Sequence, residues 1–161
     1  YGALRDWVPH RREVVKTPLA STEGTMIEAN VPLLAIPHLP GGLHLWEGAR
    51  QVLPNADLCL DGVPSGIEAQ AGVVLLLDQI NDGETVLSIL NRLQQERVDG
   101  RRLRVITTIC ASPGLKRIGE AFPDITIHTA CIDADLDEQN QILPGIGDPL
   151  QRLGIRSTQA T

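Results

Sequence analysis

Glycines and acidic residues gather in four short segments that each follow an apolar run of the chain. Glycine lets the backbone approach a ligand closely, and carboxylates bind hard cations directly or through water. The last segment contains the run Leu-Pro-Gly-Ile-Gly-Asp, whose two glycines offer bare backbone to a ligand. We expect the ligand-binding surface to be built from all four segments, which are residues 37–42, 78–85, 111–114 and 133–148.

The apolar runs before these segments have the lengths of buried strands. Between them, apolar residues recur at helical spacing, as at Val86, Leu90 and Leu93. Strands that alternate with helices predict an α/β fold with about five mostly parallel strands flanked by helices. Ligands bind beyond the carboxyl ends of such strands, so the four segments should share one rim of the sheet. The expected strands are residues 31–37, 56–60, 73–77, 103–109 and 125–130.

Local signals refine this pattern at two helices. For the helix expected over residues 115–121, Ser112 is the expected N-cap, and Pro113 suits the first turn. Trp46 lies on the apolar face of an earlier helix and is expected in the core.

The composition argues against two classes of partner. The chain has 161 residues, the size of one domain, and a formal net charge of −6. It has no basic stripe and only two tryptophans, one tyrosine and one phenylalanine, so we expect no binding to nucleic acid. No apolar run approaches the roughly 20 residues that a membrane span needs, so we expect no such span.

Cysteine usage indicates a cellular compartment. Cys59, Cys110 and Cys131 lie far apart in apolar stretches, without the close spacing of a zinc site. We expect reduced core thiols rather than disulfides, and therefore a cytoplasmic protein. The start of the chain also lacks the pattern of a signal peptide.

The chain divides into a short leading part and one domain. Residues 1–30 are weakly patterned and are expected to form an arm or an irregular lead-in. Residues 31–161 carry the alternating pattern of the domain. Because the chain begins at Tyr1 without an initiating methionine, we expect it to be truncated.

The second half of the chain carries an ordered series of motifs. It reads Thr-Ala-Cys-Ile-Asp at 129–133, Leu-Asp-Glu at 136–138 and Gln-Ile-Leu-Pro-Gly-Ile-Gly-Asp at 141–148. Upstream are Ala-Ser-Pro-Gly at 111–114 and Phe-Pro-Asp-Ile at 122–125. This series resembles the uracil phosphoribosyltransferase family, in which Thr-Ala, Ile-Asp, Leu-Asn-Glu and Tyr-Ile-Val/Ile-Pro-Gly-Leu-Gly-Asp follow in that order. The resemblance covers most of residues 31–154 and identifies a divergent member.

The resemblance implies a type I phosphoribosyltransferase fold, here with a reduced hood. It also implies a reaction in which uracil and phosphoribosyl pyrophosphate give UMP and pyrophosphate with magnesium. In the family, the backbone of the segment matching residues 141–148, here called the base loop, reads the edge of uracil, which points to Ile142 and Gly147. Fixed backbone amides and carbonyls suit a base whose donors and acceptors alternate. Asp148 would lie near the sugar and the magnesium ion and is a candidate catalytic residue and metal ligand.

A second family signature holds the 5′-phosphate of the donor. In the family, an apolar strand leads into Asp-Pro-Met-Leu-Ala-Thr-Gly-Gly-Ser, whose amides and hydroxyls surround the phosphate at a helix N-terminus. The corresponding residues 78–85, here called the phosphate loop, are one residue shorter. Asp78, Gly83 and Thr85 match the signature, and Asp78 is the second candidate catalytic residue.

Two departures add negative charge to the phosphate loop. Asp82 replaces the threonine and Glu84 replaces a glycine, and carboxylates repel a phosphate dianion at close range. Plainer roles are also open, because Asp82 is suited to cap the helix entered at Gly83 and Asp78 could simply end a strand.

Two further departures weaken the donor site. Pro40 stands where the family has an arginine that faces the pyrophosphate, and a charge-assisted hydrogen bond of that kind contributes roughly 1.5 to 3 kcal/mol. Only residues 61–72 separate two strands where the family has a longer hairpin that covers the site. We therefore expect a site that is open to water.

Two hypotheses follow from these observations. One is a uracil phosphoribosyltransferase whose activity is impaired, using magnesium only if the donor site works. The other is a non-catalytic regulatory, binding or structural subunit that keeps the fold. In either case uracil, UMP or phosphoribosyl pyrophosphate are the candidate ligands, and the resemblance implies a homo-oligomer or a subunit of a larger assembly.

Overall fold

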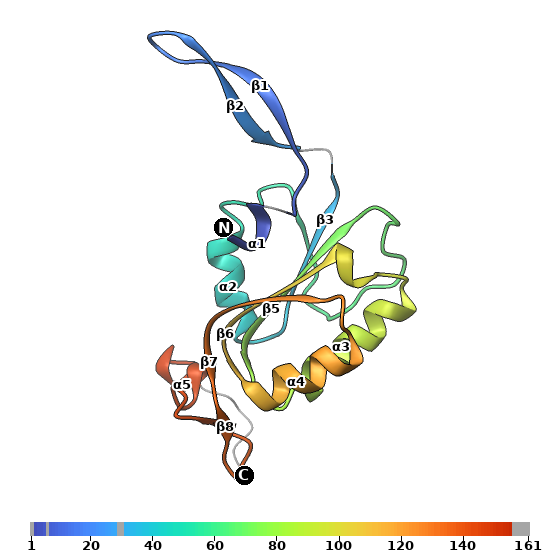
Figure 1. Ribbon diagram of the computed structural model, residues 1–161, viewed down its shortest axis with the longest axis vertical. Coiled ribbons are helices and arrows are strands. Elements are labelled where there is room, and N and C mark those ends of the chain that lie inside the picture. The colour runs from blue at the N-terminus through green and yellow to red at the C-terminus, as the bar shows by residue number, and fades with distance from the viewer. Residues whose placement is uncertain (1, 6, 29–30, 156–161) are drawn as a thin grey trace.

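The longest apolar run of the sequence forms the central strand of a parallel sheet. The computed structural model describes residues 2–5, 7–28 and 31–155. All five strands of the sheet are parallel, in the order β4-β3-β5-β6-β7 (Figure 1). The predicted α/β class and five-stranded parallel sheet are confirmed. The strands are β3 (Leu33–Pro37), β4 (Asp57–Leu58), β5 (Gly72–Ile80), β6 (Leu103–Ala111) and β7 (Thr126–Asp133).

Alternation along β5 sends side chains to two separate cores. Val73, Leu75 and Leu77 pack with Leu90 and Ile118, which lie on α3 (Glu84–Gln95) and α4 (Ser112–Ala121). Because successive side chains of a strand point to opposite faces, the residues between them meet the other layer. Both faces of β5 are thus buried, which explains why its sequence is continuously apolar.

On the second face, Val74 and Leu76 pack against Trp46, as predicted for that residue. Trp46 lies on α2 (Gly42–Ala49), and the same core includes Leu4 and Val8 from the beginning of the chain. Leu4 belongs to the short helix α1 (Gly2–Arg5). Residues of the leading part therefore contribute to the packing of the sheet.

The leading part also contains an element that the sequence pattern did not predict. Strands β1 (His10–Lys16) and β2 (Ser21–Ile27) form an antiparallel hairpin that projects away from the sheet (Figure 1). Every residue of β1 is exposed, so the alternation that reveals a half-buried strand is absent.

The opposite end of the molecule carries the chain beyond β7. Strands β8 (Asp135–Leu136) and β9 (Ile142–Leu143) pair antiparallel, and α5 (Pro149–Arg152) follows. Ile142 is buried against Ile109 and Ala111 at the carboxyl end of β6. A short 3-10 helix, η1 (Gly100–Arg102), precedes β6. No helix among the described residues is long and apolar enough to cross a membrane.

Three local expectations were wrong. Ala111, not Ser112, is the N-cap of α4, and the Ser112 hydroxyl instead donates a hydrogen bond to the Asp133 carbonyl. Gly83, not Asp82, is the N-cap of α3. Cys131 is exposed rather than part of the core, because it lies in the exposed second half of the edge strand β7.

The contact between α4 and the phosphate loop provides a test of the fold. A Cβ atom on Gly114 would lie 2.1 Å from the backbone oxygen of Asn81, whereas one on Gly119 of the same helix would meet nothing within 4 Å. We expect Gly114→Ala to lower the free energy of unfolding by roughly 1 to 3 kcal/mol through overpacking. Gly119→Ala, the matched control, should raise it by about 0.5 to 1 kcal/mol. Denaturant unfolding measures both, and equal effects would contradict this packing.

Candidate functional site

The phosphate loop carries β5 into α3. Gly83 adopts a left-handed φ of 80°, and α3 begins directly after it. A Cβ atom on Gly83 would also lie 2.9 Å from the Gly114 carbonyl oxygen. Both the left-handed conformation and this close contact therefore require glycine at position 83. The Asp82 carboxylate turns back to the helix start and accepts a hydrogen bond of 3.0 Å from the backbone N–H of Glu84. An internal anion therefore occupies the positive end of α3.

A guanidinium group balances part of this charge. Arg117 Nη1 of α4 lies 3.7 Å from Asp82 Oδ2 and also donates a hydrogen bond of 3.5 Å to the Asp82 carbonyl oxygen. Both side chains are partly exposed, so the ion pair stabilises the fold only weakly. Its consequence for the site is that Arg117 is engaged by the chain's own carboxylate.

The loop after β3 presses directly on Asp78. A Cβ atom on Gly41 would lie 2.3 Å from Asp78 Oδ2, and one on Gly42 would lie 2.2 Å from the Leu76 carbonyl oxygen. Asp78 Oδ1 accepts a hydrogen bond of 2.9 Å from the Gln79 N–H. The Thr108 hydroxyl donates to the Asp78 carbonyl oxygen. Asp78 is thus fixed between neighbouring strands and the glycine turn.

A pocket of about 230 Å³ opens at this rim of the sheet. The side-chain nitrogen Nδ2 of Asn81 donates a hydrogen bond of 2.6 Å to the backbone carbonyl oxygen of Asn140. This bond joins the phosphate loop to the chain beyond β7. The lining therefore comes from three distant parts of the sequence. The polar side chains around the pocket, among the described residues, belong to His38, Asp78, Gln79, Asn81, Asp82, Thr85 and Asn140, with no lysine or arginine.

The base loop is held by a second carboxylate. Asp133 Oδ2 accepts a hydrogen bond of 2.8 Å from the Gly145 N–H. Gly145 and Gly147 have positive φ angles of 59° and 71°. A Cβ atom on Gly145 would lie 2.1 Å from the Ile142 carbonyl oxygen, but one on Gly147 would meet nothing within 4 Å. Gly145 is therefore required by the turn, while Gly147 faces open space.

Asp148 lies at the end of the base loop and caps α5. Its Oδ1 atom accepts hydrogen bonds of 2.9 and 3.3 Å from the N–H groups of Leu150 and Gln151. Asp148 does not line the pocket that contains Asp78, Gly83 and Thr85. The structure thus brings the phosphate-loop residues together and sets Ile142, Gly147 and Asp148 in the neighbouring loop.

Comparison with known proteins assigns the chain to a family. The model of the uracil phosphoribosyltransferase family matches residues 1–153. This chain belongs to the uracil phosphoribosyltransferase family. The match begins 30 residues before the part of the chain that carries the sequence motifs, so it takes in α1 and the hairpin.

Individual relatives support the same assignment. The chain is 32% identical over 169 residues to the uracil phosphoribosyltransferase of Synechococcus elongatus, covering 95% of this chain and 78% of that relative. It is 31% identical over 164 residues to the enzyme of that name from Synechocystis, covering 92% of this chain and 76% of the relative. The structure of AQ2163 protein from Aquifex aeolicus superposes with a TM-score of 0.76 at 27% identity, covering 98% of this chain and 81% of that one.

Two cysteines lie near the carboxyl ends of β6 and β7, and the pKa of each thiol is raised. Burial raises the pKa of the Cys110 thiol, and the Asp133 charge adds to the shift. Partial desolvation, a hydrogen bond to Asp133 and the Asp133 charge raise the pKa of the Cys131 thiol. Both groups are therefore held in the protonated form, which is a poor nucleophile.

Several residues of the pocket lie within the predicted segments 37–42, 78–85 and 133–148 but were not singled out individually. His38, Gln79, Asn81 and Asn140 line it, but single polar residues in loops give no periodic or spacing signal. In residues 2–5, 7–28 and 31–155, no three His, Cys, Asp or Glu side chains lie close enough to form a metal-binding group.

The open space beside Gly147 leads to a binding prediction with a matched control. Gly154 has the same left-handed conformation, with φ of 72°, and an added Cβ atom also meets nothing within 4 Å. We expect Gly147→Ala to weaken uracil binding at least about tenfold because the methyl group would fill the space for the base. Gly154→Ala carries the same backbone strain outside the base loop and should leave binding unchanged. Calorimetric titration with uracil would contradict the assignment if both variants bound alike.

Proposed function

We propose that this protein retains the uracil site of its family and transfers phosphoribose to uracil poorly or not at all. The single observation that carries the proposal is the hydrogen bond from the Glu84 N–H to Asp82 at the start of α3. The family resemblance predicts the donor's 5′-phosphate at this helix start. Here the chain's own carboxylate occupies it.

Electrostatics supports the same conclusion. A helix N-terminus attracts one anion through its free N–H groups and its dipole. Asp82 already uses this attraction, and Glu84 places a second carboxylate on the first turn of α3. A phosphate dianion would meet repulsion from both groups. Arg117, the cation close to the loop, is paired with Asp82.

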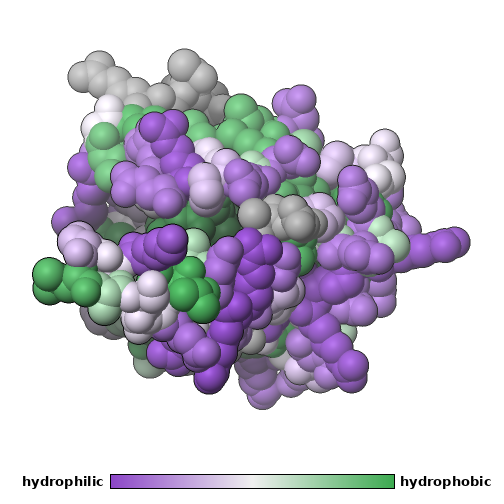
Figure 2. All heavy atoms as spheres, turned by 90° about the horizontal axis from the view of Figure 1, so that it is seen from above, coloured by the Kyte–Doolittle hydropathy of each residue, from purple (hydrophilic) through white to green (hydrophobic). Residues whose placement is uncertain are grey.

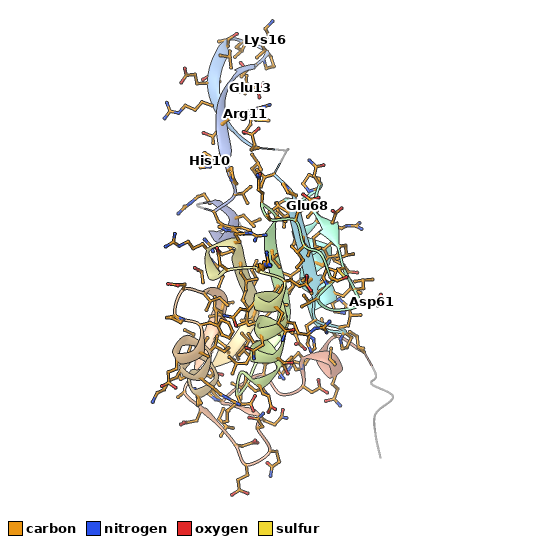
Figure 3. The ribbon with its side chains drawn as sticks, turned by 90° about the vertical axis from the view of Figure 1, so that its right-hand side faces the viewer. His10, Arg11, Glu13, Lys16, Asp61 and Glu68 are labelled. Atoms are coloured by element: carbon orange, nitrogen blue, oxygen red, sulfur yellow. The ribbon has the colours of Figure 1, made fainter. Side chains whose placement is uncertain are left out.

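The pyrophosphate side of the site is also weak. Pro40 provides no charge, and the adjacent Gly41 lies against the Asp78 carboxylate, so negative charge faces the region where pyrophosphate would leave. Figure 3 labels Asp61 and Glu68 on the loop between β4 and β5, with Glu68 nearer to the hairpin than Asp61. No residue of this loop lines the rim pocket, which supports a site that water can reach.

The two candidate catalytic residues, Asp78 and Asp148, have binding and structural roles in this proposal. The Asp78 carboxylate lines the pocket and is suited to accept hydrogen bonds from ribose hydroxyls. Asp148 caps α5, so its role would be to order the base loop rather than to bind metal. Magnesium would enter only with the donor, bound mainly by the donor's phosphates and by Asp78.

We also propose that the hairpin is covered by a second copy of the chain. An isolated two-stranded hairpin is at best marginally stable in water. Val14 is 65% exposed and Ile27 is 52% exposed, and they share one face of the hairpin. Seen from the hairpin end, hydrophobic patches break a mostly hydrophilic surface (Figure 2).

The three free thiols favour a reducing compartment, which supports a cytoplasmic location.

The catalytic proposal predicts the outcome of a restoration experiment. We expect the unaltered chain to form UMP at least about a hundredfold more slowly than the Pro40→Arg, Asp82→Thr, Glu84→Gly variant, since each restored transition-state contact of about 1.4 kcal/mol gives about tenfold. The assay follows labelled uracil with phosphoribosyl pyrophosphate and magnesium. The Synechococcus elongatus relative serves as the positive control. Rapid UMP formation by the unaltered chain would refute the proposal.

The assembly proposal predicts a change in molecular mass. Val14→Glu places a charge on the face of Val14 and Ile27, the more exposed of the two apolar pairs of the hairpin, and should convert an oligomer to a monomer. Thr22→Glu places the same charge on the opposite face, which carries the less exposed Val15 and Met26, and should leave the oligomer intact. Size-exclusion chromatography with light scattering measures both. A monomeric unaltered protein at about 100 μM would contradict the proposal, since stable interfaces hold far below that concentration.

A further inference from the structure

The rim pocket combines small size with an uncharged or acidic polar lining. Its volume of about 230 Å³ is smaller than the roughly 300 to 1,000 Å³ of pockets that enclose drug-sized ligands. It is therefore suited to one part of a ligand, of the size of a sugar ring. Its side chains offer carboxylate, amide, hydroxyl and imidazole groups, which bind hydroxyls well, and no lysine or arginine among the described lining residues is there to pair with a phosphate.

The residue that precedes the base loop in the chain lines the pocket. Asn140 contributes to the pocket and accepts the hydrogen bond of Asn81, and it immediately precedes the base loop. Ile142 then packs against Ile109 and Ala111 at the carboxyl end of β6, beside β5. A ligand whose base lies in the base loop could thus extend its sugar toward Asp78 and Thr85.

At the start of α3, which borders the pocket, a carboxylate of the chain accepts a hydrogen bond from a helix N–H. The Glu84 N–H at the start of α3 donates to Asp82, which in turn is paired with Arg117. A 5′-phosphate would have to displace a carboxylate that is part of the same chain. A free 5′-hydroxyl carries no charge and meets no such repulsion.

We infer that the site binds a pyrimidine nucleoside and rejects the corresponding nucleotide, with Asp82 as the residue that determines this specificity. The inference rests on the proposed function, because it requires that the base loop still binds uracil. It goes beyond that function by naming the class of ligand that fills the rest of the site. The Asp82 carboxylate occupies the phosphate position and so distinguishes a nucleoside from its 5′-phosphate.

The test is calorimetric titration of the full chain with uracil, uridine, UMP and ribose 5-phosphate, each separately. We expect uridine to bind at least about tenfold more tightly than UMP, because the Asp82 and Glu84 carboxylates repel the 5′-phosphate. Ribose 5-phosphate should show no binding. In the Asp82→Asn, Glu84→Gln variant, which keeps an acceptor for the Glu84 N–H, the preference should fall to about threefold or less.

A matched control separates this effect from net charge. Glu68→Gln combined with Glu120→Gln removes the same two charges from exposed positions away from the pocket and should leave the uridine preference unchanged. Equal or tighter binding of UMP by the unaltered chain, with uracil bound, would overturn the inference alone. Failure to bind both uracil and uridine would overturn the proposed function and the inference with it.

Discussion

The site depends on one hydrogen bond, from the Glu84 N–H to the Asp82 carboxylate at the start of α3. A helix start carries a partial positive charge, and a carboxylate of the chain bound there competes with an anionic ligand. Asp82 is this carboxylate, and it also pairs with Arg117 of α4. The family resemblance instead implies that the helix start in this loop binds the 5′-phosphate of the donor.

The rest of the rim is fixed by close backbone contacts that only glycine permits. Gly41 lies against the Asp78 carboxylate, and Gly114 lies against the Asn81 carbonyl oxygen. These contacts couple the loops after β3 and β6 to the phosphate loop between them. The close contacts therefore fix the shape of the rim through the backbone, while Asp82 and Glu84 set its charge.

The sheet and the family could both be predicted from the sequence. The sheet follows from the periodicity of apolar residues, and the family follows from motifs in a fixed order. The continuous apolar run of β5 follows from burial on both faces, and Gly145 of the base loop follows from a turn that leaves no room for a Cβ atom. The hairpin was missed because β1 has no buried face and so no alternation. The Asn81 to Asn140 hydrogen bond joins residues 59 positions apart, a contact that no single sequence encodes locally. Asp82 and Glu84 were recognised as departures, but only the structure shows which backbone group Asp82 occupies.

The most direct test of this account follows the Glu84 backbone amide by nuclear magnetic resonance during a titration with inorganic phosphate. If Asp82 occupies the helix start, the Glu84 amide resonance will stay in place in the unaltered protein and will move with saturation in Asp82→Thr. A saturable shift of that resonance in the unaltered protein would show that the helix start is open to phosphate and would contradict the account.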